Sequence, residues 1–378
     1  MNIFAIESSC DETAAAIMHD DQLLTNVVVS QIDIFKTYGG VIPEIAARSH
    51  LEAILPVIDQ AFASTGFKTA AGQNDWTKID ALAVTHTPGL LGSLLIGTLT
   101  ARTLAILHHK PLYAVHHLKS HIYSNWLKTE KTPEFPLLAL VISGGHTQII
   151  RMTRHNHFDI IGTTLDDAVG ECFDKIAKIL GLPYPGGPSI ATAAKTGNPK
   201  KYSFPHPKTE NPLDFSFSGL KTAVLRTVQK ECGVGLDYPS HGLKNLLTPE
   251  QIADFATSFQ ATAIDILLEK LQLAQKKYPD TKSLVFAGGV SANNLLRERA
   301  ILAFSSHCAG YGQAIAAEPR NDGREDSGDE KPKLSFPPVT FSGDNAAMVA
   351  MAAYWEIRSG IKPTDPYSLT LSPRSQIQ

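Results

Sequence analysis

The sequence is poor in cysteine and in excess positive charge. Its four cysteines, Cys10, Cys172, Cys232 and Cys308, form no CxxC pair, which favours free thiols over disulfides or a zinc knuckle. With 34 basic and 37 acidic residues the formal net charge is −3. A nucleic-acid ligand would therefore need a local basic patch or a partner subunit to contact its phosphates.

Signals for secretion, membrane insertion and two common enzyme classes are also missing. The start, MNIFAIESSCDE, is neither basic nor long enough in its apolar part for a signal peptide. The apolar stretch LLGSLLIGTLTARTLAIL is interrupted by Gly, Thr and Arg, so we predict no membrane span and a cytoplasmic protein. The chain has no GxxxxGK[ST] P-loop and no HExxH protease motif.

A strand–turn–strand pattern occurs twice. Residues 2–18 contain two short apolar runs around SSCDE, and residues 137–152 repeat this plan around SGGHT. Strands then alternate with helices, which indicates α/β layers. The repeated unit in a chain of 378 residues predicts an actin-like ATPase (ASKHA, ribonuclease H-like) fold, with two duplicated lobes around a cleft.

The predicted lobes comprise residues 1–130 with 345–378, and residues 131–344. We predict further strands over 80–85, 112–115, 159–163 and 283–287. Helices are predicted over 43–64, 90–108, 117–127, 166–180, 219–230, 249–277, 292–304 and 345–359. Segments 233–247 and 313–335 have no period and are predicted to be inserted loops. The second contains the charged run EPRNDGREDSGDEKPK and is expected to be disordered.

Two histidines four residues apart, His117 and His121, would share one face of a helix and can hold a metal ion together. With 14 histidines in the chain, a chance pair at this spacing is not rare. Asp344 in GDNAAM is the candidate third ligand, and its alternative role is to cap the helix that follows.

Asp11 and Glu12 are adjacent acids in the first hairpin turn, where they could act on a phosphate or orient a reactant. The alternative is a solvated polar turn. Three glycine-rich segments, SGGHT, YPGGPS and AGGVSAN, favour an anion or nucleotide site over simple turns. Asp167, Glu171 and Asp174 are predicted to share one helical face, as ligand contacts or as an ordinary exposed acidic surface.

Together these residues closely resemble the TsaD family of tRNA threonylcarbamoyladenosine transferases, whose early members were labelled glycoproteases. The resemblance extends over most of the chain apart from the two inserts. It rests on motifs in the family's order: ESSCDETAAAI, YGGVIPEIAARSH, the HxxxH helix, VISGGHTQ, TLDDAVGECFDKIAKILGLPYPGGP, DFSFSGLKTA, AGGVSANNLLR and DNAAMVA.

The resemblance implies transfer of a threonylcarbamoyl group from threonylcarbamoyl-AMP to the N6 amine of adenosine 37, in tRNAs that read codons beginning with adenine. It implies one divalent metal ion per subunit, iron (Fe²⁺) before zinc, on His117, His121 and Asp344. Asp11 and Glu12 match acids linked to activity. The implied partners are a paralogous actin-like subunit (TsaB) and a small ATPase (TsaE). The implied substrate-binding residues are Val141, Ile142, Ser143, Gly144, Gly145, Asp174, Gly187 and Asn293.

The sequence departs from the family at four positions. Lys119 and Ser120 replace the Glu and Gly of the usual HxEGH, Thr87 replaces a Gly, and Phe35 replaces a His common in relatives. None of these is an implied metal ligand. The alternative functions are an actin-like kinase, an O-carbamoyltransferase, a metalloendopeptidase and a subunit that only scaffolds a complex.

Overall fold

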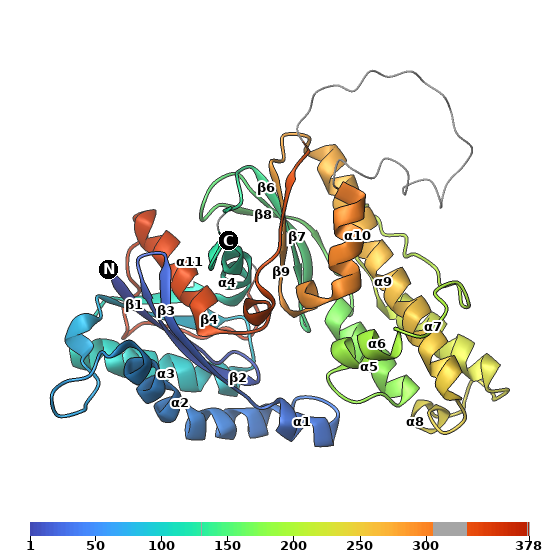
Figure 1. Ribbon diagram of the computed structural model, residues 1–378, viewed down its shortest axis with the longest axis horizontal. Helices are drawn as coiled ribbons and strands as arrows, with labels where there is room; N and C mark the ends of the chain where they lie inside the picture. Colours follow the sequence, from blue (N-terminus) through green and yellow to red (C-terminus); the bar gives the residue numbers. More distant parts are fainter. Residues whose placement is uncertain (130, 305–330, 376, 378) are drawn as a thin grey trace.

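The computed structural model describes residues 1–129, 131–304, 331–375 and 377, and contains two five-stranded mixed sheets (Figure 1). In the first sheet the order is β3-β2-β1-β4-β5. Strand β1 pairs antiparallel with β2 and parallel with β4. These strands are β1 Asn2–Glu7, β2 Glu12–His19, β3 Gln22–Ser30, β4 Ala81–Thr87 and β5 Leu112–His116.

The second sheet repeats this topology. From one edge its order is β8-β7-β6-β9-β10, and β6 pairs antiparallel with β7 and parallel with β9. Both predicted strand–turn–strand units thus open sheets of the same order and directions, which confirms the duplication. The strands are β6 Leu137–Ile142, β7 Thr147–Met152, β8 Phe158–Thr163, β9 Ser283–Ala287 and β10 Lys333–Ser335.

An apolar core lies between the two sheets. Successive side chains of a strand point to opposite faces, so Phe4 and Ile6 pack with the outer helices of the first sheet while Ile3 faces inward. In β6, Leu138 packs outward and Leu137 joins the same inner cluster as Ile3. The inner faces of the sheets therefore share one core, which fixes their relative position.

Two helices fill this shared core (Figure 1). They are α4 His117–Tyr123 and α11 Ala346–Arg358. Helix α11 packs on α4, β1 and β2, as predicted for the last helix. Its sequence AAMVAMAA has mainly small side chains on the buried surface, and these allow the helix to approach both neighbours closely.

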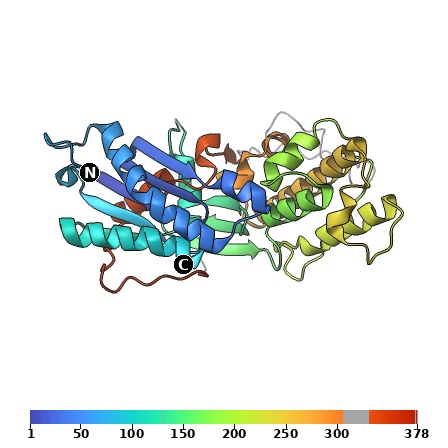
Figure 2. The ribbon, with the colours of Figure 1, turned by 90° about the horizontal axis from the view of Figure 1, so that it is seen from below.

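The outer face of the first sheet is covered by helices α2 and α3, which lie side by side in Figure 2. The helices of this part are α1 Ile32–Tyr38, α2 Pro43–Thr65, α3 Leu91–His108 and the 3₁₀ turn η1 Trp76–Lys78. Within the described residues α3 alone has the length and hydropathy of a membrane span. It packs against α2 and β4.

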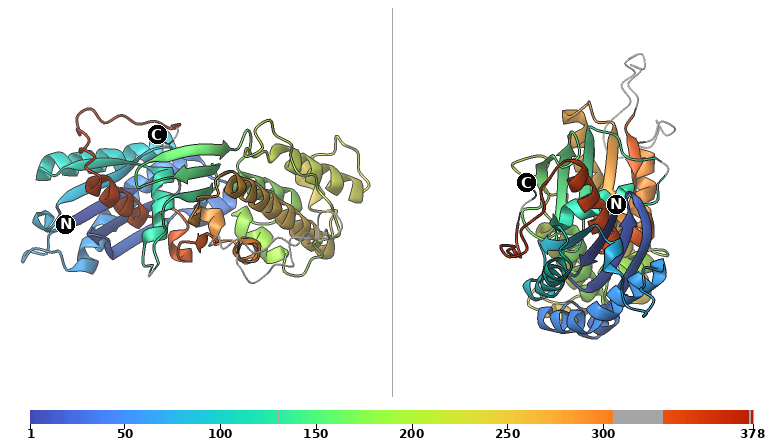
Figure 3. Two further views of the ribbon diagram at one scale, coloured as in Figure 1. Left: turned by 90° about the horizontal axis from the view of Figure 1, so that it is seen from above. Right: turned by 90° about the vertical axis from the view of Figure 1, so that its left-hand side faces the viewer.

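The second sheet carries a larger set of helices, which extends away from the first sheet in Figure 3. Helices α5, α7 and α9 supply much of its outer core. The set comprises α5 Val169–Leu180, α6 Gly186–Ala193, α7 Ser218–Glu231, α8 Ser240–Leu243, α9 Pro249–Lys277 and α10 Asn294–Phe304, with 3₁₀ turns η2 Ser124–Trp126, η3 Gly289–Ala292 and η4 Val339–Phe341 elsewhere.

One predicted helix began too early. Helix α5 starts at Val169 and not at residue 166. The carboxylate of Asp166 instead accepts hydrogen bonds from backbone amides at the start of α7, and Asp167 pairs with Lys175 and Lys221. Asp167 therefore does not belong to the acidic helical face predicted with the two acids of α5.

The predicted loop at residues 233–247 is also corrected. It contains helix α8, and Leu243 is fully buried in the outer core of the second sheet. The amide of Gln229 donates to the carbonyls of Leu236 and Tyr238 and holds the segment in place. Of the segment 313–335, the residues Lys333–Ser335 form β10 and not a loop. The rest of the segment predicted to be disordered, residues 313–330, lies outside the described residues and includes all but the last three residues of the charged run 318–333.

Candidate active site

The three predicted metal ligands lie together. Strand β5 ends at His116 and α4 begins at once, so His117 and His121 stand one helical turn apart in the shared core. The Nε2 atoms of His117 and His121 lie 3.6 Å and 3.1 Å from Oδ1 of Asp344. One possible ligand atom from each of the three residues lies within 4.8 Å of the other two.

The chemistry of this cluster fits a metal ion. Both ring nitrogens of His121 are buried and neither has a hydrogen-bond partner of good geometry, which is costly unless another ligand satisfies them. The alternative role of Asp344 as a helix cap is wrong, because Asn345 caps α11 by accepting from the amide of Met348. Two imidazoles and a carboxylate form a common set for zinc or iron.

Mutual attraction stabilises the charges in this cluster. Burial by itself lowers the pKa of His117, but Asp344 and Glu7 outweigh it and raise the pKa to about 9. Burial likewise opposes ionisation of Asp344, but His117 and His121 outweigh it and lower its pKa to about 2. Burial, reinforced by His117 and His121, lowers the pKa of His146 to about 4, so His146 stays neutral beside the centre.

The predicted acidic turn lies at the same end of the first sheet. Glu12 opens β2 and accepts a hydrogen bond from Oγ of Ser30 at 3.2 Å. Burial, followed by the charges of Asp344 and Asp11, raises the pKa of Glu12 well above its usual value. The turn is therefore close enough to the metal ligands for its charges to interact with them, unlike a simple solvated turn.

His50 of α2 contacts this turn and the start of β2 through its two ring nitrogens. Its Nε2 lies 2.9 Å from the carbonyl oxygen of Cys10, which can only accept, so Nε2 donates. Its Nδ1 then accepts from the hydroxyl of Thr13 at 2.7 Å. Burial lowers the pKa of His50, which preserves this neutral arrangement. No sequence pattern pointed to this contact between α2 and the turn.

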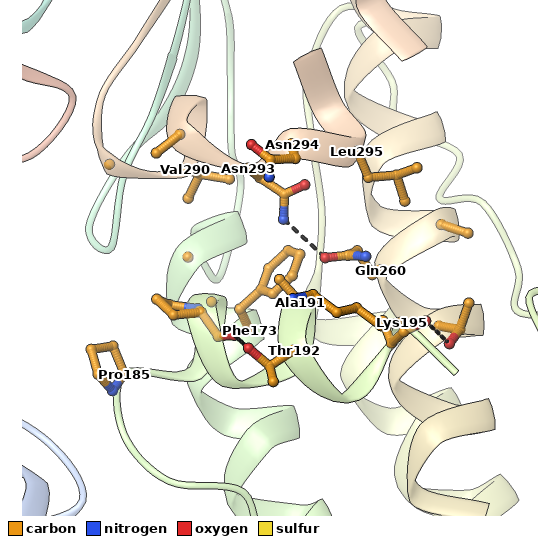
Figure 4. A pocket seen from close by; sticks show the side chains of 18 of the residues that line it. Phe173, Pro185, Ala191, Thr192, Lys195, Gln260, Val290, Asn293, Asn294 and Leu295 are labelled. Atoms are coloured by element: carbon orange, nitrogen blue, oxygen red, sulfur yellow. Dashed lines mark hydrogen bonds between the residues drawn. The ribbon is translucent and has the colours of Figure 1, made fainter. Parts of the chain in front are cut away.

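A pocket of about 830 Å³ lies in the second half of the molecule (Figure 4). The three glycine-rich segments meet there, because Gly144, Gly187 and Gly289 all line it. Asp174 and Asn293 line it too, and Nδ2 of Asn293 donates to Oε1 of Gln260 at 2.9 Å. The three glycine-rich segments thus lie around one pocket in the fold.

The segment YPGGPS forms the start of helix α6, where a loop was expected. Glycine and proline are poor helix formers, so no sequence pattern indicated this helix. Oδ1 of Asp174 accepts the amide of Gly186 at 2.6 Å and anchors the first turn. A Cβ on Gly186 would meet the Cα of Asp174 at 2.5 Å. Only glycine therefore lets α6 approach α5 this closely.

Only some of the predicted substrate-binding residues line the pocket, namely Gly144, Asp174, Gly187 and Asn293. The side chains of Val141 and Ile142 are buried in two different apolar cores, so only their backbone groups are available to a ligand. Ser143 and Gly145 flank Gly144 in the turn, where the amide of Ser143 donates to the carbonyl of His146 at 2.8 Å.

This turn between β6 and β7 connects the pocket with the metal ligands. Gly144 lines the pocket, while the charges of His117, His121 and Asp344 act on the imidazole of His146. Asp174, which lines the pocket, has a raised pKa that burial chiefly causes and to which the charge of Asp11 in the acidic turn contributes. The arrangement can hold a ligand in the pocket with its reactive end towards the cluster.

Two residues of the site were missed in the sequence. His146 was treated as part of a glycine-rich loop, although a histidine there was a potential signal. Glu7 ends the otherwise apolar strand β1 and is fully buried. A charged residue at the end of a buried strand is unusual and could have marked it.

The comparisons with known proteins agree with this geometry. The family model for TsaD, tRNA N6-adenosine threonylcarbamoyltransferase, matches residues 22–351. The enzyme of that name from Symbiobacterium thermophilum is 44% identical over 95% of this chain and 93% of its own. The one from Kosmotoga olearia is 46% identical over 96% of this chain and 95% of its own.

Among solved structures, HypF of T. kodakarensis matches with a TM-score of 0.57 and 11% identity, over 95% of this chain and 48% of HypF. This likeness concerns the fold alone. Together with the duplicated sheet order it confirms the predicted actin-like α/β fold. The sequence matches go further than the fold, since they extend at more than 40% identity over nearly the whole chain. The chain therefore belongs to the TsaD family of tRNA N6-adenosine threonylcarbamoyltransferases.

Proposed function

We propose that the protein transfers the threonylcarbamoyl group of threonylcarbamoyl-AMP to the N6 amine of adenosine 37 in tRNAs that read codons beginning with adenine, releasing AMP. The acyltransferase activity on tRNA follows from membership of the family. The observation that carries the proposal is the cluster of His117, His121 and Asp344, joined by one turn to a pocket lined by three glycine-rich segments.

The pocket is assigned to the AMP part of the donor. Its volume of about 830 Å³ suits a nucleotide. Backbone amides at Gly144 and at the start of α6 can hold the phosphate, aided by the positive end of the helix dipole. Asp174 and Asn293 would then orient the ribose or the base. The other assigned contacts are made by the backbone or by residues of the same loops. They are at Val141, Ile142, Ser143, Gly145 and Gly187.

The metal centre is assigned to His117, His121 and Asp344, with one divalent ion per subunit. We propose iron (Fe²⁺), and zinc is the alternative that the same ligands accept. When bound, such an ion supplies Lewis acidity to an oxygen of the donor. The two histidines hold their Nε2 atoms towards Oδ1 of Asp344, and neutral His146 adds no competing charge.

The acidic turn is assigned to the acceptor. The N6 amine attacks the carbamoyl carbon, a C–N bond forms, and the bond from that carbon to the phosphate oxygen of AMP breaks. The amine loses a proton in this step, and Asp11 or Glu12 takes it or orients the amine. The adenosine must leave its stack, which an anticodon loop allows at low cost.

We further propose that the protein acts in the cytoplasm together with a paralogous actin-like subunit (TsaB) and a small ATPase (TsaE). The formal charge of −3 supports a need for help in holding tRNA. Helices α2 and α3 also expose a group of leucines that a partner could cover, namely Leu51, Leu55, Leu91, Leu95, Leu99 and Leu107. The two lobes are assigned to residues 1–130 with 345–378, and to 131–344.

The kinase, O-carbamoyltransferase, endopeptidase and scaffold alternatives are not favoured, because the matched relatives at more than 40% identity all carry the transferase name. The test is mass analysis of tRNA nucleosides after incubation of the protein with threonylcarbamoyl-AMP, unmodified tRNA and candidate partners. The proposal predicts threonylcarbamoyladenosine. Unchanged adenosine under conditions where a relative from another species modifies the same tRNA would contradict it.

A further inference from the structure

Glu7 is a buried carboxylate that the reaction outlined above does not use. It is the last residue of β1 and its side chain is fully buried. A buried charge is retained only where hydrogen bonds or an opposite charge compensate for the loss of water. The partners of Glu7 therefore indicate what the residue does.

Each oxygen of Glu7 has its own partners. Oε2 lies 3.2 Å from Nδ1 of His117 and accepts from the hydroxyl of Thr85 at 2.6 Å. Oε1 accepts from the backbone amide of Ser9 at 2.5 Å. Ser9 is the second residue of the turn that carries Asp11. One carboxylate thus contacts both the metal helix α4 and the acidic turn.

The contact with Nδ1 determines which nitrogen of His117 is left for a ligand. Nδ1 also lies 3.2 Å from Oγ of Ser9, a hydroxyl that can either donate or accept. The carboxylate of Glu7 can only accept, so Nδ1 must donate and carry the proton. In the neutral ring that a metal ion requires, the lone pair is then on Nε2, and this atom is the one near Asp344, at 3.6 Å. Ligand histidines in metalloproteins commonly donate their other nitrogen to a carboxylate in this way.

We propose that Glu7 is a positioning residue that fixes the tautomer and ring orientation of His117 for metal binding and couples the metal helix to the acidic turn. The proposal rests on the proposed metal centre. It assigns a role to the carboxylate that ends β1, because no other carboxylate among the described residues forms a hydrogen bond with His117.

The test compares metal affinity in three variants of the full chain. Zinc and Fe²⁺ are titrated into metal-free protein in competition with a chromogenic chelator, the iron without oxygen. Glu7→Gln keeps the size of the side chain but removes its charge, and we expect affinity to fall about 10- to 100-fold. The matched control is Glu356→Gln, which removes another buried carboxylate, on α11, and should leave affinity unchanged.

The third variant, His121→Ala, separates this proposal from the one on which it rests. If His121→Ala loses metal binding while Glu7→Gln binds as tightly as the unaltered protein, the role of Glu7 is refuted and the metal centre stands. If His121→Ala keeps its metal, both proposals fail. The assignment is supported if metal affinity falls in Glu7→Gln and stays unchanged in Glu356→Gln.

A second measurement covers the case in which Glu7→Gln does not fold. Nitrogen-15 NMR of histidine in the zinc-loaded, unaltered protein reports the state of both ring nitrogens of His117. We expect the proton on Nδ1 and the metal on Nε2. A metal-bound Nδ1 would overturn the proposal, because Glu7 would then have no proton to accept.

Discussion

At the scale of single residues, His117, His121 and Asp344 come from segments more than 200 positions apart and meet at 3.1–3.6 Å. The spacing of the histidines predicted their shared helical face, because that pattern is local. Neither Glu7 nor His50 could be predicted in the same way. Glu7 of β1 contacts His117 of α4, and His50 of α2 contacts Cys10 of the acidic turn, and only the tertiary fold brings these pairs together.

The first prediction concerns the metal ligands. His117→Ala should lose metal and transferase activity together, because it removes one of three proposed ligands and leaves Glu7 without the hydrogen-bond donor Nδ1. Metal content by elemental analysis and product formation are measured on the same preparation. Retention of both at the level of the unaltered protein would refute the ligand assignment.

The second prediction concerns Glu356 of α11. Burial raises its pKa from 4.5 to about 7, against a smaller opposing effect of Lys119. Between pH 4.5 and 7 the carboxyl group is protonated in the folded state and ionised in the unfolded state. Its contribution to the free energy of unfolding is therefore greatest below pH 4.5 and falls as the pH rises to 7. Glu356→Gln should therefore raise the free energy of unfolding at pH 8 by about 2–3 kcal/mol at most.

Urea unfolding at pH 8 and pH 5 checks this difference. The stabilisation by Glu356→Gln should shrink markedly at the lower pH, where the carboxyl group of the unaltered protein is protonated. An equal effect of the substitution at both values would show that the carboxyl group is not titrating in this range.

At the scale of elements, the long periodic helices and buried strands were predicted well. Helix α9 and strand β9 have the bounds expected from their patterns. Helix α6 was missed because PGG opposes a helix by propensity alone, and the tertiary contact with Asp174 overrides it. The start of α5 was misplaced because Asp166 bonds the amides of α7 in preference to its own helix.

The third prediction tests the close approach of α5 and α6. Gly186→Ala should destabilise the protein by about 1–3 kcal/mol, since its Cβ would meet backbone atoms of α5 at 2.5 Å. It should also weaken binding of AMP, because α6 lines the pocket. Chemical denaturation and a binding titration with AMP measure the two effects.

Gly187→Ala is the control for the stability effect. A Cβ there would meet no atom within 4 Å, so its free energy of unfolding should change by only a few tenths of a kcal/mol. Similar destabilisation by both substitutions would mean that the loss of glycine flexibility, and not the contact between helices, sets the stability.

At the scale of the whole molecule, the duplication was predictable because each lobe opens with the same local pattern. The shared core was not, since the side chains of β1 and β6 that fill it belong to different sheets and reveal their common position only in the fold. The insertion of α4 and α11 between the sheets places the proposed metal ligands where both halves of the molecule meet.

The fourth prediction follows from this position. A metal ion bound by α4 and Asp344 binds only the folded state, so it should stabilise the molecule by about 2.7 kcal/mol at a free concentration 100 times its Kd. Thermal unfolding with and without a chelator measures the effect. The same midpoint in both conditions, for protein shown to contain metal, would contradict a centre in the shared core.

Transfer to tRNA is proposed to depend on a metal ion held by His117, His121 and Asp344. Nucleoside mass analysis of tRNA tests this dependence after reaction with metal-free protein, with the same protein reconstituted with Fe²⁺ or zinc, and with reconstituted His121→Ala, all with donor and partners present. We expect threonylcarbamoyladenosine only with the reconstituted, unaltered protein. Equal product from metal-free protein or from His121→Ala would contradict it.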